Sequence, residues 1–424
     1  MNCEIEKTKI SGKLICPPNK SYSHRAVFLS ALTKGECVIK NFLHSADTEA
    51  TINACKRFGA KIKQDDSNLI INSNSTIQPC TIDAANSGTT IRISSAIAGL
   101  AKGTTTLSGD ESLNQRPMQP LLDALELIGA KCSSSEGKPP VTITGEIKGG
   151  EISIPGDISS QFISALMIVA PISQNGINLN IEHDLVSKPY LDATITAMKK
   201  FGVMVKTEIP YKRYSIKPQS YTATTITIPS DFSNLAILLS AAVLVGDNLK
   251  IEATMSDLPQ GDEAYIDVLK KLGVDVNLSK NIFSVKSPEK LDGGKFDLSN
   301  TPDLLPPLSI LGLKTSKPIE IFNVKHARYK ESDRIAILAR ELQKLGIQVE
   351  EKDDGLILFP PIEPKGSELN SENDHRLFMS FCIAGMYVGN CTVTDPESVN
   401  VSYPNFIRDL NQVGGKIKSA HKEL

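Results

Sequence analysis

The residues best suited to chemistry stand just before an apolar run near the start of the chain. The stretch from Pro17 to Arg25 places Lys20 and Arg25 around the first turn of a predicted helix, which Asn19 or Ser21 can cap. That first turn leaves backbone N–H groups unpaired and carries partial positive charge. These residues therefore predict an anion site, although a capped surface helix with solvated cations explains this stretch alone equally well.

Four further arginines border predicted helices, in a chain where lysine is much the commoner cation; they are Arg92, Arg116, Arg334 and Arg376. Arginine presents a planar fork that matches a carboxylate or a phosphate, which lysine cannot imitate. Each arginine alone is typical of a solvated or ion-paired surface residue. Together they indicate a cleft that binds a polyanion.

The densest charged stretch, residues 325–334, directly precedes a predicted helix over residues 335–345. Asp333 can cap that helix, which explains one acid without any catalysis. Glu331 stands between Lys330 and Arg334, where it is either the partner of those cations or a group that transfers a proton in a cationic cleft. For this stretch in isolation, the sequence favours the ion-pair interpretation.

Composition narrows the class of protein. With 424 residues and 40% hydrophobic residues the chain should form two or three globular domains, and a net charge of −2 gives no basic face for nucleic acid. The eight cysteines lack the paired spacing of zinc or redox sites and are expected to be reduced packing residues. The start of the chain lacks a signal peptide's apolar core, and residues 235–245 are too short an apolar run to cross a bilayer. We therefore expect a cytoplasmic protein with no membrane partner.

One unit recurs six times along the chain. In each copy an amphipathic helix ends at a glycine and leads into a short strand, at intervals of about seventy residues; the glycines are Gly59, Gly129, Gly202, Gly273, Gly346 and Gly414. A second, more apolar helix occurs once per copy, and its polar start falls at residues 20–21, 86–89, 159–161, 230–233, 301–303 and 373–376. Helices this apolar should be buried, with their polar starts at one surface.

These repeats predict the domain organisation. Three copies precede a turn-rich stretch near residues 217–230, and three follow it. We expect an α/β protein of two similar domains, residues 18–228 and residues 1–17 with 229–424, and a ligand site in the cleft between them.

Seven motifs at the predicted helix starts and loops occur in a fixed order: Lys20-Ser21-x-Ser23-x-Arg25-Ala26, Asn86-Ser87-Gly88-Thr89-x-x-Arg92, Gln115-Arg116-Pro117-Met118, Ser159-Ser160-Gln161-Phe162, Ser187-Lys188-Pro189-Tyr190, Lys330-Glu331-Ser332-Asp333-Arg334 and Asp374-His375-Arg376. Together, over essentially the whole chain, they closely resemble the 5-enolpyruvylshikimate-3-phosphate synthase (EPSP synthase) family of enolpyruvyl transferases. Each motif alone is weak, but the ordered set is highly specific.

The resemblance implies both a fold and a reaction. The implied fold has two domains, each of three βαβαββ units whose buried helices point their N-termini at the interdomain cleft, an inside-out α/β barrel. The implied enzyme is a 3-phosphoshikimate 1-carboxyvinyltransferase of the shikimate pathway, which leads to chorismate and the aromatic amino acids. It would transfer the enolpyruvyl group of phosphoenolpyruvate to the 5-hydroxyl of shikimate 3-phosphate and release phosphate. No metal or organic cofactor is implied, and we expect a monomer.

The resemblance also assigns roles, residue by residue. Shikimate 3-phosphate would be held by Lys20, Ser21, Arg25, Ser159, Ser160, Gln161, Ser187, Tyr190, Asp303 and Lys330. Phosphoenolpyruvate would be held by Lys20, Asn86, Gly88, Arg116, Gln161, Arg334 and Arg376, in a site shaped by Thr89, Arg92, His326 and His375. Asp303 and Glu331 would carry the protons, with Lys20 as their partner in both steps.

Two positions depart from the family pattern. Val401 stands where the family usually has a lysine, and His326 stands where an asparagine is common. Neither change removes a proton carrier, so we expect activity with weaker or differently arranged phosphoenolpyruvate binding.

Two alternative functions have less support in the sequence. The sister enolpyruvyl transferase that acts on UDP-N-acetylglucosamine typically has a reactive cysteine in its second unit, yet this chain has no cysteine between Cys80 and Cys132. A non-catalytic anion-binding relative is supported only by Val401, and the retained Lys20, Asp303, Glu331 and arginines argue against it.

Overall fold

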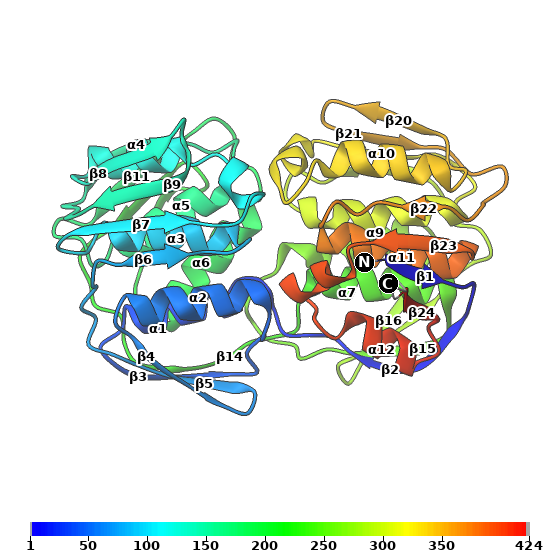
Figure 1. Cartoon of the computed structure of the whole chain (residues 1–424), viewed down its shortest axis with the longest axis horizontal. Coiled ribbons are helices and arrows are strands. Elements are labelled where there is room, and N and C mark those ends of the chain that lie inside the picture. The colour runs from blue at the N-terminus through cyan, green and yellow to red at the C-terminus, as the bar shows by residue number, and fades with distance from the viewer. Residues whose placement is uncertain (1, 421–424) are drawn as a thin grey trace. The chain divides into compact units, whose positions relative to one another are not determined.

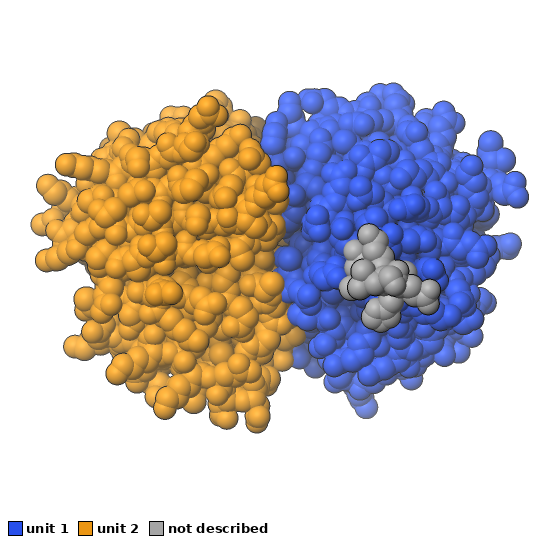
Figure 2. Space-filling view, in the orientation of Figure 1, with its two compact units in different colours: residues 1–17, 230–256, 261–424 blue, residues 18–229, 257–260 orange. Residues whose placement is uncertain are grey.

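The computed structural model describes residues 2–420, which divide into two compact units (Figures 1 and 2). Unit 2 consists of residues 18–229 and 257–260, and unit 1 consists of the other described residues. Each unit has an apolar core of its own. None of the helices within residues 2–420 combines the length and the apolar character needed to cross a membrane.

Across residues 2–420 the strands form six four-stranded sheets, three in each unit. Unit 2 contains the sheets β14-β3-β5-β4, β6-β7-β9-β8 and β10-β11-β13-β12. Their strands are β3 (Gly35–Lys40), β4 (Lys61–Asp65), β5 (Asn68–Ser73), β6 (Thr81–Asp83), β7 (Thr104–Ser108), β8 (Lys131–Ser135), β9 (Lys138–Thr144), β10 (Gly150–Pro155), β11 (Ile177–Glu182), β12 (Lys206–Ile209), β13 (Arg213–Ile216) and β14 (Thr225–Thr227).

Unit 1 contains the sheets β2-β15-β17-β16, β18-β19-β21-β20 and β22-β23-β1-β24. Their strands are β1 (Asn2–Ile5), β2 (Ile10–Ile15), β15 (Gly246–Glu252), β16 (Asp275–Ser279), β17 (Ile282–Lys286), β18 (Gly294–Asp297), β19 (Ile319–Phe322), β20 (Val349–Lys352), β21 (Gly355–Leu358), β22 (Glu368–Leu369), β23 (Cys391–Thr394) and β24 (Ile417–Ala420). The last of these sheets joins both ends of the described chain, because β1 pairs with β23 and β24.

All six sheets share one pairing pattern. The first strand of each sheet as written runs parallel to the second, while the second and third and the third and fourth pair antiparallel. The repeated pattern confirms the α/β fold of six similar units.

The helices alternate between two kinds along the chain (Figure 1). The predicted amphipathic set is α2 (Ala46–Arg57), α4 (Gln119–Leu127), α6 (Lys188–Lys200), α8 (Tyr265–Lys271), α10 (Arg334–Lys344) and α12 (Phe406–Gln412). Each of these six helices is followed, two residues after its end, by the predicted glycine, with φ between 82° and 113°. A left-handed residue at this position closes the last helical turn, and glycine adopts it without steric cost.

The second, apolar set lies buried between the sheets. Its members are α1 (Lys20–Ala31), α3 (Gly88–Ala98), α5 (Ser160–Val169), α7 (Phe232–Val245), α9 (Leu305–Ile310) and α11 (His375–Val388). Five of them begin after a side chain that accepts a backbone N–H bond: Asn19, Ser87, Ser159, Asp231 and Asp374. The polar helix starts predicted from the sequence are thus confirmed as caps, and at α1 the cap is Asn19 rather than Ser21.

The fifth copy differs from the other five. In place of one long buried helix, it has η3 (Pro302–Leu304), the short α9 and η4 (Leu311–Lys314). Pro302, Pro306 and Pro307 explain the break, because proline has no backbone N–H to continue a helical ladder. The remaining short 3₁₀ turns are η1 (Leu113–Gln115), η2 (Gly261–Ala264), η5 (Lys325–Tyr329) and η6 (Pro396–Val401).

Candidate functional site

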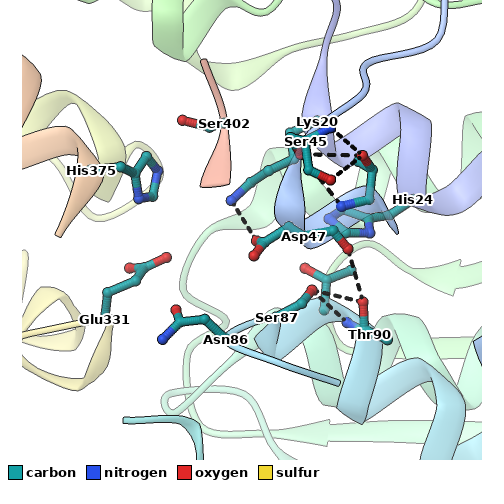
Figure 3. Close-up of polar contacts among 12 residues, drawn as sticks. Lys20, His24, Ser45, Asp47, Asn86, Ser87, Thr90, Glu331, His375 and Ser402 are labelled. Atoms are coloured by element: carbon teal, nitrogen blue, oxygen red, sulfur yellow. Dashed lines mark hydrogen bonds and ion pairs between the residues drawn. The ribbon is translucent and has the colours of Figure 1, made fainter. Parts of the chain in front are cut away.

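Lys20 is the first residue of α1 and forms an ion pair that the sequence did not predict. Its Nζ lies 2.9 Å from Oδ2 of Asp47, in the first turn of α2, and both side chains are largely buried (Figure 3). The capping box of Ser45 and Thr48 fixes that turn. An acid in the first turn of a helix is stabilised by the helix dipole alone. The sequence therefore did not indicate that Asp47 pairs with Lys20.

Arg25 lies one turn further along α1 and is buried. Its Nε donates to Oγ1 of Thr194 at 2.8 Å, and its other nitrogens donate to the carbonyl oxygens of Tyr190 at 2.9 Å and Ser21 at 3.1 Å and to the Ser21 hydroxyl. Burial lowers the pKa of Arg25 to about 10, so the group stays cationic at neutral pH. Ser187 is buried, has a left-handed backbone conformation and directly precedes α6.

Gly88, the first residue of α3, lies where two arginines and an amide converge. A Cβ added to Gly88 would lie 3.1 Å from a guanidinium nitrogen of Arg116, 3.6 Å from one of Arg92 and 3.6 Å from Oε1 of Gln161. The lack of a side chain therefore lets these groups come close to the backbone N–H groups at the helix start.

Arg92 is held by the start of α5. Its NH1 donates to Oε1 of Gln161 at 2.6 Å and to Oγ of Ser159 at 3.4 Å, and its guanidinium lies 4.9 Å from the centre of the Phe162 ring. Gln161 in turn donates to Oγ1 of Thr89 at 3.1 Å. These contacts link the polar starts of α3 and α5.

Arg116 lies just after η1 and is the second arginine near Gly88. Its NH2 donates to Oδ1 of Asn86 at 2.9 Å and to Oγ of Ser112 at 3.4 Å. Asn86 is oriented for this by donating its amide N–H to Asp110 at 2.8 Å. Ser160, the first residue of α5, is buried beside these groups in the same unit.

In unit 1 one arginine holds both of the expected proton carriers. Arg334, the first residue of α10, is fully buried. Its NH1 lies 2.7 Å from Oδ1 of Asp303, its NH2 lies 2.8 Å from Oε2 of Glu331 and its Nε lies 2.8 Å from Oδ2 of Asp374. Asp333 caps α10 by accepting from the N–H of Ala336, as predicted.

Asp303 has further cations around it. Arg376, on the first turn of α11, lies 3.2 Å from its Oδ2, and Nζ of Lys330 lies 3.9 Å from its Oδ1. Burial acts to raise the pKa of Asp303, but the charges of Arg376, Lys330 and Arg334 outweigh it and hold the pKa well below its ordinary value. Asp303 is therefore ionised in this arrangement.

Asp262 is a further buried carboxyl group near Asp303, and no sequence motif indicates it. Asp262, in η2, accepts a hydrogen bond from the hydroxyl of Ser233 on the first turn of α7. Burial and the negative charge of Asp303 raise the pKa of Asp262 to about 7, against the opposing effects of Ser233 and Arg376. Only the tertiary structure joins these residues, so no local pattern could have revealed the cluster.

Three more predicted positions lie in unit 1. His326, in η5, is buried, and burial together with the charge of Lys330 lowers its pKa to about 4, so the ring is neutral at neutral pH. His375 is the buried first residue of α11, and Val401 is the half-buried last residue of η6, which contacts α11. Among residues 2–420, no three histidine, cysteine, aspartate or glutamate side chains gather as metal ligands.

The predicted residues thus form two groups, one in each unit. The first comprises Lys20, Ser21, Arg25, Asn86, Gly88, Thr89, Arg92, Arg116, Ser159, Ser160, Gln161, Ser187 and Tyr190, and the second comprises Asp303, His326, Lys330, Glu331, Arg334, His375 and Arg376. In each group every arginine is buried.

Comparisons with known proteins agree on one family. The family model described as EPSP synthase (3-phosphoshikimate 1-carboxyvinyltransferase) matches residues 5–410. A 3-phosphoshikimate 1-carboxyvinyltransferase of Nitrosopumilus maritimus is 61% identical, over 99% of this chain and 100% of its own length. A second enzyme of that name, from Methanosarcina mazei, is 42% identical with both chains covered in full.

A solved structure gives the same result. EPSP synthase from Acinetobacter baumannii superposes with a TM-score of 0.81 at 26% sequence identity, covering 98% of this chain and 99% of its own. Since family model, full-length relatives and fold all agree, the chain belongs to the EPSP synthase family.

Proposed function

We propose that this member of the EPSP synthase family transfers the enolpyruvyl group of phosphoenolpyruvate to the 5-hydroxyl of shikimate 3-phosphate and releases phosphate. The observation that carries the proposal is that the family motifs of unit 2 coincide with the capped starts of buried helices, while unit 1 holds two carboxyl groups that are fixed by Arg334. Helix starts and arginines suit anionic substrates, and the carboxyl groups suit proton transfer.

The residues of unit 2 supply most of the binding groups. Shikimate 3-phosphate is assigned to Lys20, Ser21, Arg25, Ser159, Ser160, Gln161, Ser187 and Tyr190, together with Asp303 and Lys330 of unit 1. Phosphoenolpyruvate is assigned to Lys20, Asn86, Gly88, Gln161 and Arg116, together with Arg334 and Arg376 of unit 1. The support is that Arg25 and Arg116 donate to neutral oxygens, which leaves their charge available to an anion.

The reaction needs proton transfers in both directions. In the addition step, the 5-hydroxyl oxygen bonds to C2 of phosphoenolpyruvate while a carboxylate removes the hydroxyl proton and an acid protonates the methylene carbon. The tetrahedral ketal then loses a methyl proton and phosphate, which restores the enol double bond. We assign these transfers to Asp303 and Glu331, with Lys20 as partner.

The charges around Asp303 fit this role. Because Arg376, Lys330 and Arg334 hold the pKa of Asp303 well below its ordinary value, its carboxylate is a weak base. The phosphate and carboxylate groups of the substrates would offset Arg376, Lys330 and Arg334, and the proton affinity of Asp303 would rise when the substrates bind.

The direct test is phosphate release. The purified chain is mixed with shikimate 3-phosphate and phosphoenolpyruvate, and free phosphate is followed together with the enolpyruvyl product. We expect release that requires both substrates and falls strongly in Asp303→Asn. Release with UDP-N-acetylglucosamine in place of shikimate 3-phosphate, or none with either acceptor, would overturn the proposal.

We also propose that the enzyme acts as a cytoplasmic monomer on small-molecule substrates. The eight cysteines are free, and six of them are buried, which suits a reducing compartment. Size-exclusion chromatography with light scattering tests the oligomeric state, and a dimer at micromolar concentration would contradict it.

A further inference from the structure

Asp374 performs two structural tasks with one carboxylate. It caps α11, since its Oδ1 accepts from the backbone N–H of Arg376 at 2.9 Å and of Leu377 at 3.5 Å. It also accepts from Nε of Arg334 at 2.8 Å, from NH2 of the same arginine at 3.3 Å and from the hydroxyl of Ser332 at 3.1 Å. Its side chain is fully buried.

The geometry of Arg334 explains why this matters. A guanidinium has five N–H donors in a rigid plane, and a carboxylate that meets two nitrogens along one edge fixes the orientation of that plane. Asp374 takes the edge formed by Nε and NH2. The remaining donors of NH1 and NH2 meet Asp303 and Glu331.

We propose that Asp374 is a positioning residue of the reaction, which acts through Arg334 to hold Asp303 and Glu331 in fixed places. The inference rests on the proposed function, because Asp303 and Glu331 are the proton carriers of that reaction. It adds a role for a residue that touches no reacting atom and that the sequence presents only as a helix cap.

The charges favour this role over simple capping. A buried guanidinium needs compensating charge, and removal of one partner leaves the others to compete for it. Without the carboxylate of Asp374, Arg334 would be oriented only by Asp303 and Glu331. Those two carboxylates would then shift whenever the arginine shifts. Since Ser332 and the α11 backbone also hold Asp374, its own position is well determined.

Asp374→Asn tests the proposal, because asparagine caps helices as well as aspartate but carries no charge. The matched control is Glu341→Gln. Glu341 is also a fully buried carboxylate of unit 1, paired with Arg340 at 2.6 Å and Lys344 at 2.6 Å, and lies outside the assigned site. The Glu341→Gln variant measures how much stability is lost when any buried, paired carboxylate is neutralised.

We expect Asp374→Asn to lower kcat about tenfold or more, with KM for shikimate 3-phosphate changed by less than about threefold. Glu341→Gln should lose thermal stability while kcat stays within about twofold of wild type. Loss of stability alone in both variants, with kcat retained, would overturn the positioning role of Asp374.

Two further measurements keep the outcome clear. If Asp374→Asn does not fold, Ser332→Ala removes one bond to Asp374 without changing charge, and kcat should fall about two- to fivefold; an unchanged kcat would count against the proposal. Inactive wild-type enzyme would instead overturn the proposed function, so the two failures are distinguishable.

Discussion

The two groups of predicted site residues, one in each unit, use arginine in different ways. In unit 2, Arg25 and Arg116 donate to hydroxyl, carbonyl and amide oxygens, which are neutral. In unit 1, Arg334 and Arg376 meet carboxylates. The same residue type is thus oriented by dipoles in one unit and by ions in the other.

The difference separates binding from proton transfer. An arginine held by neutral groups keeps its charge for a ligand, and its removal should mainly weaken binding. An arginine held by acids has its charge offset already, and it serves to fix those acids. We therefore expect substrate affinity to depend mainly on unit 2 and turnover mainly on unit 1. Lys20, paired with Asp47, is the exception in unit 2.

The largest effect is expected for Glu331→Gln. Glutamine keeps the shape of the side chain and can still accept from Arg334, but it cannot carry the proton. We expect kcat to fall about a hundredfold or more, with little change in either KM. Steady-state phosphate release measures both quantities.

The opposite result has a clear meaning. If Glu331→Gln keeps a near-normal kcat and loses only thermal stability, Glu331 is an ion-pair partner of Arg334. The acid would then lie elsewhere, with Lys20 the first candidate. Asp303→Asn differs from both outcomes, because we expect it to lower kcat and to weaken binding of shikimate 3-phosphate as well.

Lysine substitutions compare the two arginine types directly. Arg116→Lys should raise KM for phosphoenolpyruvate about tenfold with a small change in kcat, since the planar fork toward the anion is lost while the neutral partners stay satisfied. Arg334→Lys should lower both kcat and the melting temperature, because lysine cannot hold three carboxylates. If both variants change KM alone, the proposed division between the units is wrong.

The sequence predicted the repeat and offered the pair of Glu331 and Arg334 as one of two interpretations, but it did not predict the ion pairs between distant residues. The six glycines and the caps at Ser87, Ser159 and Asp374 could be found because each depends on a few neighbouring residues and one backbone conformation. The sequence analysis did not predict the broken fifth helix, although Pro306 and Pro307 indicate it. The regular period of the repeat suggested a helix there, and the two prolines were not taken into account.

The site residues show the same division. The motifs gave the residue types, yet Asp47 lies 27 residues from its partner Lys20, and Asp374 lies 40 residues from its partner Arg334. Such pairs arise when separate helix starts are brought together by packing, and their charges alone do not reveal the pairing. Asp47, Asp262 and the pairing of Asp374 with Arg334 were therefore recognised only in three dimensions.

A smaller effect is expected from restoring the missing cation. Val401 ends η6, which contacts α11, the helix that begins with His375 and Arg376. Val401→Lys should lower KM for phosphoenolpyruvate by up to about tenfold, if one partly exposed charge-assisted bond worth ~1.4 kcal/mol is formed. Val401→Met, of similar length without charge, is the control. Equal KM values in both variants would mean that another group already fills that place.

The smallest effect concerns the pH dependence of stability and depends on Asp262. Its pKa is raised by burial and Asp303 to about 7, from an ordinary value of 3.8. Between these values the folded protein keeps a proton that the unfolded chain has released. The stability from this group is therefore complete below about pH 4 and is lost as the pH rises to about 7.

Asp262→Asn removes this titration and keeps an oxygen for Ser233, while Asp231, Asp303 and Arg376 around it stay the same. The melting temperature of the variant minus that of wild type should therefore become more positive by a few degrees between about pH 5 and about pH 8. Scanning calorimetry of both proteins measures the difference. If it is equal at both pH values, Asp262 is already ionised at the lower pH, held by Arg376, and belongs with the ion-paired acids of unit 1.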